Sequence, residues 1–173
     1  MKIKYYPLNH FNERPADITI DTIVIHSMYA KGQSKPTAAL PCFKILDENK
    51  VSSHFSIDRL GTVWQHVEDS KRAWHAGKSS MPPSAKHPSP RENVNDFSIG
   101  IEMIGVWSER FRARQYRSLI RLIAELLKKF PIETIVSHQS IAPDRKNDPG
   151  PSFRWDILRR GMRRRKIHVR ILS

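Results

Sequence analysis

Two kinds of hydrophobic spacing alternate along the chain. Apolar residues recur at every second position in some segments, as in β-strands, and at three- and four-residue steps in others, as in helices. Residues 22–26 read TIVIH and are rich in β-branched side chains. Ile23 and Ile25 would share one face of such a strand, with Val24 and His26 on the other. The pattern therefore predicts a strand that closes with a histidine.

The same alternation predicts further strands. Residues 98–104 read SIGIEMI, which places three apolar side chains on one face and Glu102 on the other. Residues 55–58 and 62–67 are two short strand candidates joined by a turn that contains glycine, as in a hairpin. Residues 134–138, TIVSH, predict another strand that ends in a histidine.

Helical periodicity is clearest in residues 112–130, where apolar residues recur at three- and four-residue steps and Pro131 would end the helix. Shorter helices are predicted for residues 36–44 and 155–162. Residues 78–94 contain four prolines and predict a long loop. Loops of this length inside a small domain tend to be lids or binding elements.

This order of elements predicts an α/β fold: a single domain with a central mixed β-sheet flanked by α-helices. The chain has 173 residues, 39% of them hydrophobic, and shows neither internal repeats nor a linker. We expect one domain over residues 1–173, with a core of about residues 18–162 and a basic C-terminal tail at residues 159–173.

Charge changes the picture of possible partners. The chain has 30 lysine and arginine residues against 17 aspartate and glutamate residues, a formal net charge of +13. Such a charge attracts polyanions over long distances. No recognised nucleic-acid-binding motif is present, so we expect no nucleic-acid partner. The basic tail is either a solvated end or an element that engages large anionic substrates, and we expect no part in chemistry for it.

Two absences bear on the compartment. Residues 1–15 lack the apolar run of about 7 to 15 residues that a signal peptide needs. No segment approaches the roughly 20 apolar residues of a membrane span, so no integral membrane association is expected. We expect the protein to act as a monomer and, if Met1 is the native start, to be cytoplasmic. The periplasm or cell envelope is the alternative.

Candidate chemistry centres on two histidines and a carboxylate. The single cysteine, Cys42, rules out an internal disulfide and a cysteine-based zinc finger. A metal site would therefore use histidines and carboxylates. His26 and His138 each close a predicted strand, and Asp148 follows ten residues later. Three such ligands with one open position match a catalytic zinc site, although this spacing alone is a weak signal among eight histidines.

Five segments together resemble a known family. They read TIVIHS (residues 22–27), VSSHFSIDRLGTVWQHV (51–67), RAWHAGKS (72–79), NDFSIGIEM (95–103) and IVSHQSIAPDRKNDPGPSFRW (135–155). In this order they resemble the type 2 N-acetylmuramoyl-L-alanine amidases, zinc enzymes whose superfamily includes phage T7-type lysozyme and the peptidoglycan recognition proteins. The matching segments cover most of residues 22–155.

The resemblance implies a role for each matching residue. It implies that Zn²⁺ is the cofactor, held by His26, His138 and Asp148, with Glu102 as catalytic glutamate and Lys146 as catalytic lysine. Substrate-binding roles are implied for Trp74, His75 and Asn95, with packing, capping or turn formation as the alternatives for these three. His54 also matches a recurrent family histidine, but we do not expect it to be a ligand.

The implied reaction is hydrolysis of the amide bond between N-acetylmuramic acid, or its 1,6-anhydro form, and the L-alanine of the stem peptide. The expected partners are peptidoglycan fragments or intact cell wall, in degradation or recycling. The alternative function is a recognition module that binds peptidoglycan without cutting it. Since all three implied zinc ligands are present, the sequence favours the enzyme.

Overall fold

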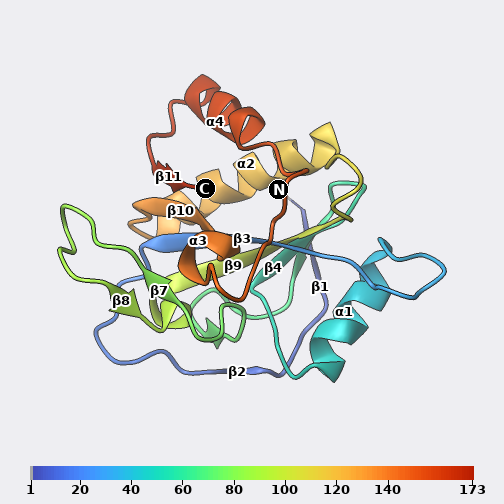
Figure 1. Cartoon of the computed structure of the whole chain (residues 1–173), viewed down its shortest axis with the longest axis horizontal. Helices are drawn as coiled ribbons and strands as arrows, with labels where there is room; N and C mark the ends of the chain where they lie inside the picture. Colours follow the sequence, from blue (N-terminus) through green and yellow to red (C-terminus); the bar gives the residue numbers. More distant parts are fainter. Residues whose placement is uncertain (1) are drawn as a thin grey trace.

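A seven-stranded sheet organises the molecule. In the computed structural model, which describes residues 2–173, its strands lie in the order β1 (Ile3–Tyr5), β5 (Val63–Gln65), β4 (Phe55–Ile57), β9 (Ser98–Ile104), β3 (Thr22–Met28), β10 (Thr134–Ser137) and β11 (Arg170–Leu172) (Figure 1). All neighbouring pairs are parallel except β4 and β5, which form an antiparallel hairpin. The predicted central mixed sheet is therefore confirmed.

The middle of the sheet is buried on both faces. Strands β9, β3 and β10 run parallel, and every residue of β9 is buried. In this register His26 on β3 lies opposite Glu102 on β9. Side chains of residues paired in this way project from the same face of a sheet, so the fold itself places these two groups side by side.

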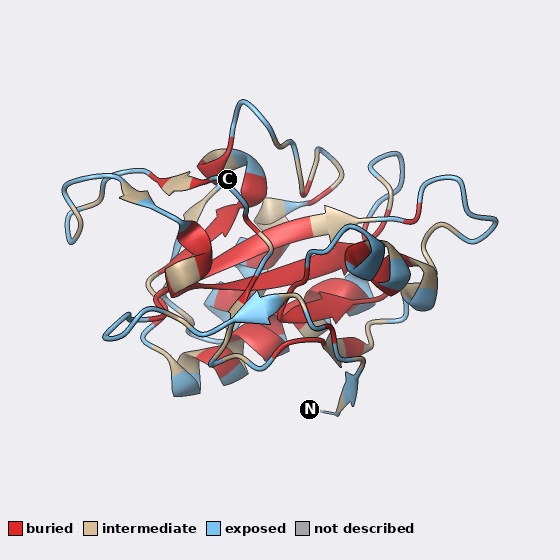
Figure 2. Ribbon diagram, turned by 90° about the horizontal axis from the view of Figure 1, so that it is seen from below, coloured by how far each residue is buried: buried red, intermediate tan, exposed pale blue. Residues whose placement is uncertain are grey.

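One face of the sheet is covered by two helices, α2 (Ala113–Lys129) and α4 (Trp155–Arg164). The apolar stripe of α2 packs on side chains from β3 and β9, including Ile23 and Ile25. This is the face that the alternation in β3 predicted for the two isoleucines. Figure 2 shows the buried stripe of the helices against the buried strands, with the exposed residues of the helices turned outward.

Two other helices lie on the opposite face, which carries Val24 and His26. Helix α3 (His138–Ile141) packs through Ile141 on Val24 and Val136. Helix α1 (Ala39–Glu48) packs through Phe43 against Trp64. Helices α1 and α3 cover different parts of this face. A cleft between these two helices leads to the carboxyl ends of the central strands.

Two expected element ends differ from the structure. The helix expected at residues 36–44 begins at Ala39 and continues to Glu48. His138 was expected to close a strand, but β10 ends at Ser137 and His138 is the first residue of α3. The reason is a helix cap, since the Ser137 hydroxyl oxygen accepts a hydrogen bond of 3.0 Å from the backbone N–H of Ser140.

The proline-rich segment at residues 78–94 is a small hairpin. Strands β7 (Ser80–Met81) and β8 (Arg91–Glu92) pair antiparallel, and Met81 is buried in the core under α3. Arg91 donates two hydrogen bonds, of 2.7 and 3.1 Å, to the buried Asp21 carboxylate. Within residues 2–173, no residue of this hairpin lines the cleft between α1 and α3.

The ends of the chain contribute more structure than expected. The core was expected over about residues 18–162, yet β1 and β11 form the two edges of the main sheet. Two short strands, β2 (Phe11–Asn12) and β6 (Arg72–Ala73), also pair, and a 3₁₀ helix, η1 (Val94–Phe97), precedes β9. The basic segment 159–173 is divided between α4, a connection and β11. Across the described residues, no helix has the length and apolar character to cross a membrane.

A buried histidine ties the N-terminal segment to the sheet. His66 is 4% exposed and packs on Phe43 with ring centroids 4.5 Å apart. Its Nδ1 donates to the Tyr6 carbonyl and its Nε2 accepts from the Ser56 hydroxyl, both at 2.7 Å. Burial lowers the pKa of His66 from its usual 6.5 to about 4.

This shift predicts a pH dependence of stability. Between pH 6.5 and about 4 the unfolded chain binds a proton that the native His66 refuses, so the free energy of unfolding falls as pH is lowered, by up to about 3 kcal/mol from this group. His66→Asn keeps an N–H near Nδ1 but does not titrate. We expect its unfolding free energy, from urea titrations at pH 7.5 and 4.5, to depend less on pH than that of the wild type. His168→Asn, at an exposed histidine, should show the same pH dependence of unfolding free energy as the wild type. Equal pH dependence in all three proteins would contradict the prediction.

Candidate active site

The candidate site lies where three parallel strands end. Going across the sheet, β9 supplies Glu102, β3 supplies His26, and β10 leads directly into His138. Because neighbouring parallel strands end at the same edge of a sheet, residues far apart in sequence meet there. Asp148 reaches the same place from the segment after α3, where its carbonyl accepts a hydrogen bond of 3.0 Å from the backbone N–H of Gln139.

His26, His138 and Asp148 form a tight cluster. His26 Nδ1 lies 2.9 Å from His138 Nδ1 and 3.2 Å from Asp148 Oδ2, and His138 Nδ1 lies 3.1 Å from the same oxygen. The two histidine side chains are almost fully buried, and that of Asp148 is 13% exposed. These three residues could hold a metal ion, and they are the three that the resemblance implied.

The donor set fits zinc. His138 Nε2 lies 3.1 Å from the Ala76 carbonyl, which can only accept a hydrogen bond, so the proton of the neutral ring is on Nε2 and Nδ1 has a free electron pair. That electron pair points at the Asp148 carboxylate, an arrangement that a cation between them would stabilise. Two atoms at 2.0 to 2.2 Å from a tetrahedral zinc ion lie about 3.3 to 3.6 Å apart. The observed separations are within a few tenths of an ångström of this value.

Protonation in the cluster follows its surroundings. Burial, together with the nearby His138, lowers the pKa of His26 to about 4, so this ring is neutral at pH 7. At neutral pH His26 therefore offers a neutral imidazole, the protonation state that metal binding requires of a histidine.

Glu102 lies beside the cluster with an unused oxygen. The residue is 8% exposed, and within the described residues its buried Oε2 has no hydrogen-bond partner. Burial, and then the nearby Asp148 charge, raises the pKa of Glu102 well above its usual value, while Lys146 acts in the opposite direction. A buried carboxyl group without a partner costs free energy, and a raised pKa of this kind is common for groups that move protons.

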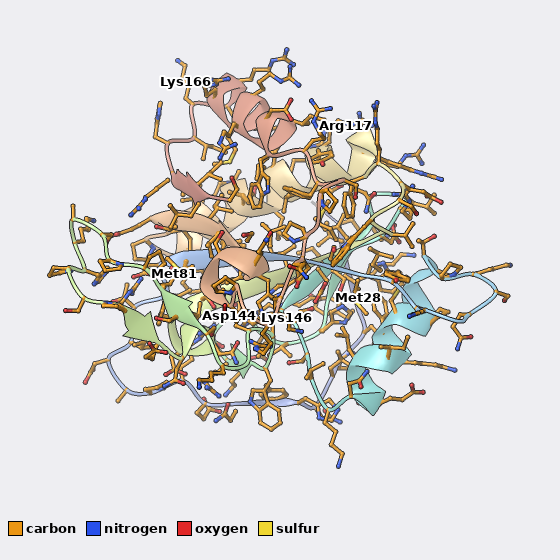
Figure 3. All side chains as sticks on the ribbon, viewed as in Figure 1. Met28, Met81, Arg117, Asp144, Lys146 and Lys166 are labelled. Atoms are coloured by element: carbon orange, nitrogen blue, oxygen red, sulfur yellow. The ribbon has the colours of Figure 1, made fainter. Side chains whose placement is uncertain are left out.

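A cleft of about 310 Å³ gives access to these groups from solvent. Its wall includes His26, Glu102, Asp148 and Lys146, together with residues from the end of α1. In Figure 3, Lys146 and Met28 lie near each other in the middle of the molecule, whereas Lys166 lies far away beside α4. The structure thus gathers all the expected metal-binding and catalytic residues around one opening and leaves the basic end of the chain distant from it.

The three expected substrate-binding residues have different positions. Trp74 lines the cleft and is 38% exposed, with its ring N–H donating to Asn12 Oδ1 at 2.9 Å. His75 also lines the cleft, but its ring contacts His26. Asn95 lies behind the cleft wall, where its side-chain oxygen accepts from the backbone N–H groups of His75 and Ala76 at 3.2 and 2.8 Å.

Trp107 is a cleft residue that the sequence pattern did not identify. It is 41% exposed, and its ring N–H donates to the Ser27 hydroxyl at 3.0 Å. Ser27 in turn donates to the Pro149 carbonyl at 3.1 Å. The ring also lies on Gly150, where a Cβ atom would come within 2.7 Å of it. A tryptophan in the polar segment that follows a buried strand was the only available signal.

Fold and site together define the class. A family model described as N-acetylmuramoyl-L-alanine amidase matches residues 16–151. The chain therefore belongs to the N-acetylmuramoyl-L-alanine amidase family, and the assignment to this family and enzyme class made from the sequence is confirmed.

Individual relatives agree with this assignment. The chain is 35% identical over 169 residues to the 1,6-anhydro-N-acetylmuramyl-L-alanine amidase AmpD of Citrobacter freundii, an alignment that covers 88% of this chain and 86% of the relative. It is similar to the crystal structure of a selenomethionine derivative of AmpD, with a TM-score of 0.75 and 33% identity over 92% of this chain and 93% of the other. It is also similar to the amidase AmiD of E. coli in complex with an anhydro-N-acetylmuramic acid peptide, with a TM-score of 0.67 and 27% identity over 86% and 60% of the chains.

The position of Asn95 predicts a structural effect. Asn95→Ala would leave the buried backbone N–H of Ala76 without an acceptor, which typically costs about 1 to 3 kcal/mol. We expect urea denaturation to show a loss of stability in this range, and a smaller loss for Asn95→Asp, which keeps an oxygen at the same place. Asn147→Ala, at an exposed asparagine, is the matched control. Unchanged stability of Asn95→Ala would contradict this role.

Proposed function

We propose that this protein is a zinc-dependent hydrolase that cuts the amide bond between N-acetylmuramic acid, or its 1,6-anhydro form, and the L-alanine of the stem peptide, in peptidoglycan recycling or degradation. The main support is the convergence of two imidazole nitrogens and a carboxylate oxygen within 3.2 Å, beside a buried, unpaired Glu102, in a chain of this family. The relatives act on, or were crystallised with, muramyl peptides according to their names.

His26 Nδ1, His138 Nδ1 and Asp148 Oδ2 would hold the zinc ion. Two nitrogens and one oxygen would give three protein ligands, the number that catalytic zinc sites usually have. When bound, zinc supplies Lewis acidity, which brings the pKa of a nearby water toward neutrality and polarises a carbonyl group.

Glu102 would move the protons of the reaction. It takes a proton from the attacking water and returns one to the nitrogen of the L-alanine as the amide bond breaks. Its buried position suits both steps, because the raised pKa makes it a better base than an exposed carboxylate and a competent acid afterwards. At low pH Glu102 is protonated and cannot act as base, so the rate should fall with decreasing pH on the acidic side.

Lys146 would stabilise the negative charge that develops on the carbonyl oxygen of the substrate. It lines the same cleft as Glu102 and His26, and a fixed positive charge near a developing oxyanion lowers the barrier most in a site sheltered from water. Trp74 and Trp107 present exposed aromatic faces at the cleft, which suit the C–H face of a sugar or the apolar parts of a stem peptide.

The metal proposal predicts a stoichiometry of about one zinc per chain. Asp148→Ala removes one of three ligands, so we expect loss of both zinc and activity, since a two-ligand site rarely retains zinc. Elemental analysis gives the zinc content, and mass spectrometry of digested anhydromuropeptides gives the free stem peptide. Asp144→Ala, an exposed aspartate four residues earlier, should keep both. Active wild-type protein that contains no zinc would rule the proposal out.

Glu102→Gln separates proton transfer from metal binding. The amide keeps the size of the side chain and loses the base, so turnover of the same muropeptide should fall by roughly 10² to 10⁴ while zinc content stays unchanged. Digesting intact sacculi beside the soluble anhydromuropeptides, with both proteins, would also reveal which substrate the cleft prefers. Near-normal turnover in Glu102→Gln would assign the proton to another group.

A further inference from the structure

His75 contacts one of the proposed metal ligands directly. Nδ1 of His26 lies in the cluster, and Nε2 on the other side of the ring lies 3.0 Å from His75 Nδ1. The two rings meet nearly edge to face, with centroids 5.0 Å apart. A neutral imidazole carries its proton on either nitrogen, and only the form with Nδ1 free can bind a metal through Nδ1. The group that His75 presents to Nε2 therefore decides which form is favoured.

The direction of hydrogen bonding is set at a backbone carbonyl. Ser98 Oγ lies 2.5 Å from the Val94 carbonyl oxygen and 3.3 Å from His75 Nε2. A carbonyl oxygen can only accept, so the single hydroxyl proton of Ser98 is donated to Val94. The Ser98 oxygen is then an acceptor, and His75 Nε2 must carry the proton that it receives.

The same reasoning extends through both rings. The two ring nitrogens of His75 lie against His26 and the Ser98 hydroxyl and against no carboxylate, so a charged ring would have no counter-ion here and the ring has one proton. With that proton on Nε2, His75 Nδ1 is an acceptor and His26 Nε2 is the donor. With its proton on Nε2, His26 presents the electron pair of Nδ1 to His138 and Asp148.

We propose that Ser98 and His75 are positioning residues that hold His26 in its Nε2-protonated form and thereby raise the affinity of the site for its metal. The inference rests on the metal site proposed above, and it gives His75 a role different from the substrate contact that the sequence suggested. Hydrogen-bonded groups behind a ligand commonly change metal affinity by about 10- to 100-fold.

The sheet is shaped to hold His75 in this place. A Cβ atom at position 100 would lie 2.4 Å from His75 Cγ, so the His75 ring occupies space that the side chain of any residue other than glycine would need. The backbone N–H of Gly100 donates to His54 Nδ1 at 2.9 Å, and the His54 ring centroid lies 5.5 Å from that of His75. His54 thus supports the ring from the side without reaching the cluster.

Zinc affinity measured by competition with a chromogenic chelator tests the proposal. We expect His75→Leu, which fills similar space without an acceptor, to bind zinc about 10- to 100-fold more weakly than the wild type. His75→Asn should recover most of the loss, because its amide oxygen can occupy the place of Nδ1. Ser98→Ala, which removes the anchoring acceptor, should weaken binding in the same direction by a smaller factor.

His66→Leu is the matched control. His66 is also a buried histidine bonded to a serine hydroxyl and a backbone carbonyl, but its ring nitrogens contact Tyr6 and Ser56 and no residue of the cluster. We expect this variant to lose stability in urea while a folded sample keeps wild-type zinc affinity. If His75→Leu also keeps wild-type affinity, or if His75→Asn is as weak as His75→Leu, the hydrogen-bond relay is wrong.

A measurement on the wild type avoids any folding defect in the variants. Long-range ¹H–¹⁵N correlation spectra report which ring nitrogen is protonated, and we expect Nε2 of His26 to carry the proton in both the zinc-loaded and the metal-free full chain. Protonation at Nδ1 in the metal-free chain would overturn the relay. Wild-type protein that binds no zinc would instead overturn the metal site itself, so the two failures are distinguishable.

Discussion

The whole structure is subject to one constraint, the repulsion between the electron pairs of His26 Nδ1, His138 Nδ1 and Asp148 Oδ2. Two imidazole nitrogens and a carboxylate oxygen face one another at about 3 Å, with both histidine side chains almost fully buried. Such an arrangement is unfavourable unless a cation is present or a proton is shared. Backbone carbonyls and buried hydrogen bonds on the far side of the rings leave little freedom to reorganise, so the rest of the fold holds an arrangement whose natural partner is a metal ion.

The parallel centre of the sheet supplies that rigidity. Strands β9, β3 and β10 are packed on both faces, and the core under α2 and α4 fixes their register. A slip of one residue would turn His26 to the helix-covered face and expose an isoleucine in its place. Packing on the side remote from the cleft is therefore a condition for chemistry within it, although no residue of α2 or α4 lines the cleft wall.

Long periodic segments were predictable because burial on a repeating face dictates their composition. Strands β3 and β9 and helix α2 were predicted within one or two residues of their bounds. The short strands at the edges, two or three residues long, have no room for a period, and the expected loop at residues 78–94 became a hairpin through one buried methionine and one ion pair. The ligand set came from the resemblance, since spacing alone left many histidine pairs open. The contact between His75 and His26 depends on the space left by Gly100, which no linear pattern reveals.

The cluster also joins distant parts of the chain. Its members are separated by 112 residues between His26 and His138, and by 122 between His26 and Asp148. Contacts of such long range form only after a large loop has been closed, which is slow relative to local structure. A fragment lacking either end of this span cannot assemble the three ligands. Retention of the ion would therefore show that these distant segments have come together in the folded chain. The bound ion would also slow global unfolding, because unfolding must separate ligands that lie far apart in the sequence.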